Sequence, residues 1–192
     1  MKQFSKAAIA AALTLGTLAS ANASIIITEP GADGFNIETL AFNGSSYDIT
    51  KLTFDFTGTT TGDASNIVID GSPLSVTAPA GGTATFFGSG AVFGFDFTSF
   101  NSFDTFKFKW DPDSAVSGSY GATGLDFIGA TITAVTSGGV YKGTFAKVGN
   151  TPDVAAVLSP FTPAVPEAES FALALAGLAA VGGIAARRSR KA

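Results

Sequence analysis

The stretch FDTFKFKWD, residues 103–111, decides the fold class of this chain. Its large apolar and its polar side chains alternate: Phe106, Phe108 and Trp110 against Thr105, Lys107 and Lys109. A period of two places the rings on one face of an extended strand and the polar groups on the other. The stretch therefore predicts a β-strand with one buried face, in which Trp110 belongs to the core.

The same alternation recurs along the chain, in LTFDFT (residues 52–57) and in FGFDF (residues 93–97). Weaker strand candidates are shorter: 25–28, 66–70, 85–87, 130–136 and 140–145. Glycine-rich turn signals separate them, and no run before the C-terminal segment has helical periodicity with caps. We expect an all-β domain, an antiparallel β-sandwich of about eight to ten strands; a jelly roll or a partly closed barrel is the alternative.

The composition excludes several kinds of chemistry. The chain has no cysteine and no histidine, so it has no disulfide, no thiol nucleophile and neither the commonest general base nor the commonest zinc ligand. Residues 24–166 carry five lysines against thirteen acidic residues, a net charge of −8, and every arginine lies beyond them. We therefore expect no nucleic-acid partner, because an acidic body repels phosphate.

The N-terminus has the three parts of a secretory signal. Lys2 and Lys6 precede an apolar stretch over residues 7–19. Ala21 and Ala23 then give the small-x-small pattern of a cleavage site. We expect residues 1–23 to be a signal peptide with a helical apolar part, and the mature chain to begin at Ser24.

The C-terminus carries a second apolar segment. Residues 171–186 contain no charged side chain, and as a helix they would span roughly 24 Å. Four cations follow: Arg187, Arg188, Arg190 and Lys191. This pattern predicts a transmembrane helix whose basic end stays in the cytoplasm, with the acidic body on the other side. A permanent membrane anchor is one interpretation of this segment.

The motif before that segment favours a second interpretation. Val165, Pro166 and Glu167, followed by an apolar helix and a basic end, resemble the PEP-CTERM sorting signal, although Ala168 stands where the family has a second proline. The resemblance covers residues 165–192. It implies an exported protein that the inner membrane holds transiently, that an exosortase processes, and that reaches the cell surface or the exopolysaccharide matrix of a biofilm. The domains expected are a body over 24–152, a proline- and alanine-rich linker over 153–165 and a sorting tail over 166–192.

Candidate ligand-binding residues are few. Asp111 and Asp113 flank Pro112, and such a pair offers oxygen ligands for Ca²⁺, with Asp104 and Asp126 as further candidate ligands if the fold brings them close. The alternative is an acidic turn that ends a strand. Trp110, Tyr47, Tyr120 and Tyr141 are candidates for stacking on a sugar, and Tyr120, in a glycine- and serine-rich stretch, is the preferred one.

We expect a non-enzymatic surface or matrix protein with no catalytic residues and no required cofactor. A lectin-like module that binds polysaccharide, with or without Ca²⁺, is the first alternative. A hydrolase that uses paired carboxylates is the second, and it requires two such groups facing each other in a cleft.

Overall fold

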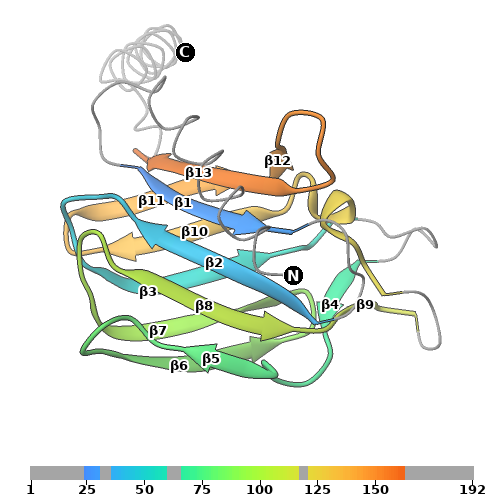
Figure 1. The fold of residues 1–192 in the computed structure, drawn as a ribbon, viewed down its shortest axis with the longest axis horizontal. Helices are drawn as coiled ribbons and strands as arrows, with labels where there is room; N and C mark the ends of the chain where they lie inside the picture. Colours follow the sequence, from blue (N-terminus) through green and yellow to red (C-terminus); the bar gives the residue numbers. More distant parts are fainter. Residues whose placement is uncertain (1–23, 31–35, 60–65, 117–120, 163–192) are drawn as a thin grey trace, which may run out of the picture. The chain divides into compact units, whose positions relative to one another are not determined.

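A computed structural model describes residues 24–30, 36–59, 66–116 and 121–162 of the chain (Figure 1). The expected signal peptide, Tyr120, the sorting motif at Val165, Pro166 and Glu167, and the basic end lie outside these described residues. Within the described ranges, no helix has the length and hydropathy that crossing a bilayer requires.

The described residues form thirteen strands and one short 3₁₀ helix, η1 (Gly124–Phe127). The strands are β1 (Ile25–Glu29), β2 (Ile37–Asn43), β3 (Ile49–Asp55), β4 (Ile67–Ile69), β5 (Ser75–Thr77), β6 (Thr83–Ser89), β7 (Val92–Phe100), β8 (Thr105–Trp110), β9 (Pro112–Ser114), β10 (Thr131–Thr136), β11 (Gly139–Thr144), β12 (Ala146–Lys147) and β13 (Val154–Pro160). The expected all-β class is confirmed. The strand number exceeds the expectation because β5, β9 and β12 are too short to show alternation.

Eleven strands form one antiparallel sheet in the order β5-β8-β2-β1-β13-β11-β10-β3-β7-β6, with β12 beside β13. The sheet curls until it is nearly closed like a barrel, and its two edge strands are β5 and β6. Strand β13 joins the two halves of this sheet, because it pairs with β1 from Val154 to Leu158 and with β11 at Tyr141 and Lys142. Strands β4 and β9 form a separate two-stranded sheet.

The expected linker over residues 153–165 is wrong for its first half. Residues Val154–Pro160 form β13, and Val154, Ala156 and Leu158 are fully buried. Small residues and prolines suggested an extended spacer, and the chain is indeed extended here. A linker would be solvated, whereas β13 lies between two strands in the middle of the sheet.

Strand β2 was not among the strands predicted from alternation. Its burial alternates regularly, but the buried side chains are Ile37, Thr39, Ala41 and Asn43. Leu40 is only half-buried on the other face. The inward face of β2 is therefore small and polar, and apolar periodicity does not reveal it.

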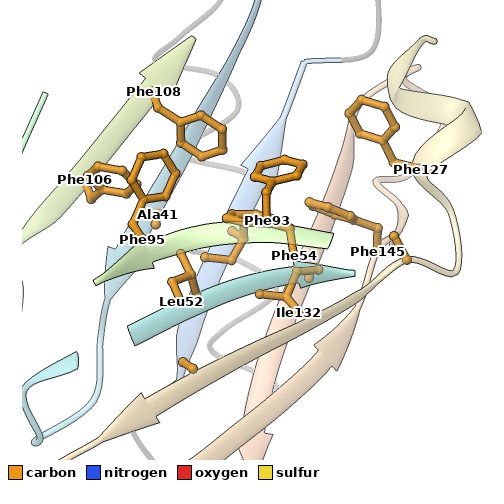
Figure 2. Close-up of a cluster of buried hydrophobic side chains, with 14 of the residues drawn as sticks. Ala41, Leu52, Phe54, Phe93, Phe95, Phe106, Phe108, Phe127, Ile132 and Phe145 are labelled. Atoms are coloured by element: carbon orange, nitrogen blue, oxygen red, sulfur yellow. The ribbon is translucent and has the colours of Figure 1, made fainter. Parts of the chain in front are cut away.

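The core is lined with aromatic rings from both halves of the curled sheet. Phe54 on β3 lies 5.4 Å from Phe108 on β8, and Phe95 on β7 lies 4.7 Å from Phe106, between ring centroids. Figure 2 shows these rings converging between the strands. All four rings are at most 1% exposed, and burying each stabilises the fold by roughly 2 kcal/mol. Trp110 is fully buried among them, as expected.

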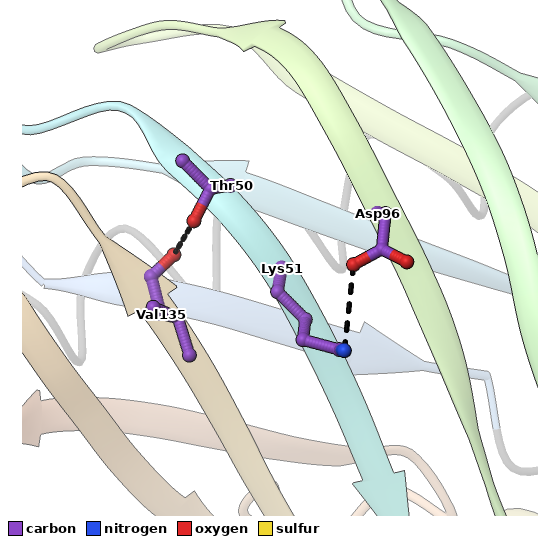
Figure 3. Close-up of polar contacts among 4 residues, drawn as sticks. All are labelled: Thr50, Lys51, Asp96 and Val135. Carbon is purple, nitrogen blue, oxygen red and sulfur yellow. Dashed lines mark hydrogen bonds and ion pairs between the residues drawn. The ribbon is translucent and has the colours of Figure 1, made fainter.

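A β-bulge bends the start of β3. Ile49 and Lys51 pair with β10 and β7, but the register shifts past Thr50 on both sides. The Thr50 hydroxyl donates to the carbonyl of Val135 at 3.2 Å, and the Lys51 ammonium lies 3.5 Å from the Asp96 carboxylate (Figure 3). Both contacts are on the solvent side, so they fix the local register more than they add stability.

The sheet has two ends, which we name after a buried residue at each. The Asn43 end holds the turns over residues 44–48, 101–104 and 137–138, together with the start of β1 and the end of β13. The Trp110 end holds β4, β9 and η1. Candidate sites lie at both ends.

Candidate functional site

Three carboxylates gather at the Trp110 end. Asp113 lies on β9, Asp111 precedes it, and Asp70 follows β4, which pairs with β9. The backbone N–H of Asp70 donates to the Asp111 carbonyl at 3.3 Å. Partial burial, and then the nearby charges of Asp111 and Asp70, raise the pKa of Asp113 above its usual value. The residues of the predicted Asp111–Asp113 pair therefore do interact.

The other two proposed calcium ligands are not part of this group. Asp104 precedes β8 and Asp111 follows it, so about 20 Å of strand separates them. Asp126 accepts hydrogen bonds from the backbone and the hydroxyl of Thr123, both at 2.8 Å, and so caps η1. Among the described residues, no group of three or more acidic side chains is disposed to hold a metal ion. The geometry at Asp111 and Asp113 thus fits an acidic strand end better than a calcium site.

A chain of buried polar groups crosses the same end. The indole N–H of Trp110 donates to the Thr39 hydroxyl at 3.0 Å, and that hydroxyl donates to Oε1 of Glu29 at 2.5 Å. Glu29 is 1% exposed, and its Oε2 has no hydrogen-bond partner. Desolvation raises the pKa of Glu29 to about 8 against the opposing hydrogen bonds from Thr39 and Trp110, so the group is largely protonated at neutral pH.

Glu29 is a core residue rather than a catalytic one. A carboxylic acid with a raised pKa is often a proton donor in a cleft. Here the side chain is inside the sheet, and its described partners are a threonine and a tryptophan of the core. The hydrolase expectation needs two carboxylates facing each other in a cleft, and Glu29 supplies no such pair.

A buried amide organises the opposite end. The Asn43 side chain is fully buried, and its Nδ2 donates to the carbonyls of Tyr47, Phe100 and Asn101 at 2.9, 3.1 and 3.1 Å. Its Oδ1 accepts from the Ser45 hydroxyl at 2.6 Å and from the Ser45 backbone at 3.1 Å. One residue on β2 therefore ties the β2–β3 turn to the β7–β8 turn.

Three aromatic side chains project from the turns and strand ends around Asn43. Phe103 is 75% exposed, and Tyr47 and Phe161 are each 44% exposed. The Tyr47 ring lies against Gly138, where a Cβ would approach within 2.5 Å of the ring. Phe161, which follows β13, donates its backbone N–H to Val140 at 2.7 Å and lies under the Lys142 ammonium, 4.3 Å from the ring centroid.

Phe103 has an unusual backbone. Its φ is +67°, in the left-handed region that favours glycine. The turn is fixed from both sides, because the N–H of Phe103 donates to the Asn43 carbonyl at 2.6 Å and the N–H of Asp104 to the Asn101 carbonyl at 3.2 Å. A bulky residue that is both strained and exposed contributes little to folding, which makes it a candidate for contact with a ligand.

Sequence reasoning named Tyr47 but did not bring it together with Phe103 and Phe161, for identifiable reasons. Tyr47 and Phe103 are 56 positions apart, and Asn43 joins their turns through hydrogen bonds that no local pattern encodes. A positive φ at a phenylalanine has no sequence signal either. The available clue was Phe103 itself, which lies two residues before the alternating run that begins at Thr105 and out of phase with its buried face.

Comparisons with known proteins assign neither a family nor a function to this arrangement. No family model matches the sequence, and no curated protein and no solved structure matches the chain significantly.

Proposed function

We propose that the chain is an exported surface or matrix protein, delivered through a PEP-CTERM-like tail and playing a structural role outside the cell. In this proposal residues 1–23 direct export, an exosortase-type enzyme recognises Val165, Pro166 and Glu167, and the inner membrane holds residues 171–186 until processing. The domain between these signals is the part that persists, in association with exopolysaccharide.

One observation supports this proposal most directly. Strand β1 begins at Ile25, directly after Ser24, and β13, the last strand of the described residues, ends at Pro160, five residues before the sorting motif. A folded domain that fills the interval between two removable signals survives removal of both. The paired ends of β1 and β13 also place the two attachment points beside each other.

The facing aromatic halves of the sheet support classing the domain as a β-sandwich joined along one side by the β11–β13 pairing. Such a domain folds without disulfides or cofactors, which suits a chain that has no cysteine. It also presents an acidic surface, which keeps an extracellular protein soluble.

The test is the intact mass of the native protein. The full chain is produced in a bacterium that has an exosortase and in its exosortase-deleted derivative. We expect the mature chain to begin at Ser24 in both, and to lose its C-terminal segment only when the exosortase is present. A Pro166→Ala, Glu167→Ala double variant should retain that segment in both hosts. A mature protein that keeps residues 1–23, or one that is cut identically without the exosortase, would refute the proposal.

A second candidate function is binding of polysaccharide, for which the exposed rings at the Asn43 end would be the contact. Aromatic faces stack on sugar rings, and Phe103 and Tyr47 present such faces. Titration of the purified protein with exopolysaccharide, with and without Ca²⁺, checks this. Binding that Phe103→Ser weakens would support it, whereas no binding and no melting shift would exclude it.

A further inference from the structure

We propose that the Asn43 end of the domain is a lipid-contacting surface, on which Phe103, Tyr47 and Phe161 rest at the bilayer interface while the tail holds the chain in the membrane. The inference rests on the proposed function, because it needs the apolar segment 171–186 to be inserted. It adds an orientation of the domain and a role for residues that folding does not explain.

The position of the chain exit is the first argument. Phe161 follows β13 at the Asn43 end, and nine residues separate it from Phe171, where the apolar segment starts. Nine residues span at most about 30 Å even when fully extended. An inserted tail therefore keeps the domain within that distance of the bilayer, and the end that bears the exit can approach most closely. Such tethering raises the effective concentration of the lipid surface around these rings.

The second argument is that the turns and the strand end that carry the three aromatic residues are joined to one another. The Tyr47 carbonyl and the Asn101 carbonyl bind the same Asn43 amide, which places the Tyr47 and Phe103 turns side by side. The Tyr47 ring then lies against the Gly138 turn, and the strand after that turn binds the backbone of Phe161 through Val140. The three exposed aromatic residues thus follow one continuous line of contacts across this end.

The chemistry favours lipid over sugar. Phe103, the most exposed of the three, has no polar group with which to orient a sugar, whereas aromatic rings with a polar tip or a nearby cation are typical of the membrane–water interface. Tyr47 has such a tip, and Phe161 has the Lys142 ammonium above it. Asp48 and Asp104 lie at the same end, so attraction to anionic lipid contributes little. The contact should therefore form on zwitterionic vesicles and withstand salt.

The backbone strain at Phe103 fits this role. A left-handed backbone is unfavourable for phenylalanine relative to glycine. The Asn43 network holds the turn in that geometry, which keeps the ring directed away from the core and 75% exposed. A rigid, outward ring can enter an interface without a further ordering cost.

The experiment uses the absence of cysteine from the chain. The full-length protein is reconstituted in phosphatidylcholine vesicles, with a single environment-sensitive fluorophore on Ser102→Cys or, as a control at the Trp110 end, on Leu125→Cys. Flotation with the vesicles reports insertion of the tail. Nitroxide lipids then report contact with the bilayer. We expect quenching at position 102 and none at position 125.

Two further variants separate ring contact from general proximity. Phe103→Ser in the Ser102→Cys chain should lose most of the quenching, and Val116→Ser, which removes an exposed side chain at the Trp110 end, should not change it. Trp110 emission verifies that each variant is folded. A chain that does not float refutes the tail insertion and this inference together. A chain that floats while the label at position 102 stays unquenched refutes the inference alone. The inference is also refuted if nitroxide lipids leave this label unquenched and only polysaccharide, or a second copy of the chain, shields it.

Discussion

At the scale of single residues, the most consequential group is the buried carboxyl of Glu29. The side chain is enclosed by the core, and only one of its oxygens has a hydrogen-bond donor. Folding therefore favours its neutral form, with a pKa of about 8 against 4.5 for an unperturbed glutamate. Between these two values the folded chain keeps a proton that the unfolded chain releases.

This difference in proton binding sets the direction of a pH dependence. The stability contributed by neutral Glu29 is fully present below about pH 4.5 and is lost as the pH rises towards 8, by up to about 1.4 kcal/mol per pH unit. We expect Glu29→Gln, which is neutral at every pH, to flatten this loss and to be more stable than the native chain near pH 8. Urea unfolding at about pH 5 and about pH 8, followed by Trp110 emission, measures the free energy of unfolding of both proteins.

Glu38→Gln is the matched control for this experiment. Glu38 lies on the same strand as Thr39, but its side chain is 42% exposed and faces Lys107 at 3.5 Å. Its substitution should leave the pH dependence unchanged. The interpretation of Glu29 fails if Glu29→Gln and the native chain lose stability in parallel as the pH rises.

The strain at Phe103 has its own test. Glycine adopts a φ of +67° without steric cost, so Phe103→Gly should raise the free energy of unfolding above that of Phe103→Ala by about 1 kcal/mol. Both variants lose the aromatic ring, so the difference between their free energies of unfolding reports the strain of the left-handed backbone. Chemical denaturation of the two proteins provides the measurement, and equal stabilities would mean that the turn relaxes in the absence of the ring.

At the scale of elements, the sequence predicts strands whose inward face is more apolar than the outward one. Strands β3, β7 and β8 have Phe54, Phe95 and Phe108 on their inward faces, and alternation identifies all three. Strand β2 buries Thr39 and Asn43 because they bind partners from other strands, so its apolar period is weak. Partners that are distant in sequence thus decide which face of β2 is buried.

The turns at the Asn43 end depend on one amide. Asn43→Ala removes three donor contacts at a buried site, where the Tyr47 and Asn101 carbonyls keep only Ser45 and Asp104 as donors, so we expect it to cost roughly 3 kcal/mol. Asn43→Asp keeps the shape but places a carboxylate oxygen against those carbonyls, and it should cost at least as much. Thr50→Ala, which removes one exposed hydrogen bond, is the control and should cost well under 1 kcal/mol. Thermal and urea unfolding measure all three, and a mild Asn43→Ala would show that water replaces the amide.

At the scale of the whole molecule, the fold class follows from local alternation, whereas the joining of the two halves of the sheet and the aromatic end do not. This joining requires the first and last described strands to pair, Ile25 with Leu158 and Glu29 with Val154, across almost the whole length of the domain. Val157 and its small neighbours in β13 match a spacer by composition. The residues of β13 are identified as a strand only by the gap that they fill between β1 and β11, and that gap exists only in the assembled sheet.

The role of β13 gives the sharpest test of the fold. A chain that ends at Thr162 keeps β13, and a chain that ends at Pro152 lacks it and exposes the edges of β1 and β11. If residues 153–165 were a linker, both chains would fold alike. We expect the chain ending at Thr162 to unfold cooperatively with a blue-shifted Trp110 emission. The chain ending at Pro152 should show red-shifted emission or aggregate, because it loses the buried Val154, Ala156 and Leu158 and leaves an open seam in the sheet. A cooperative, native-like transition in the shorter chain would contradict the position of β13 between β1 and β11. It would also contradict the placement of the chain exit beside the aromatic rings.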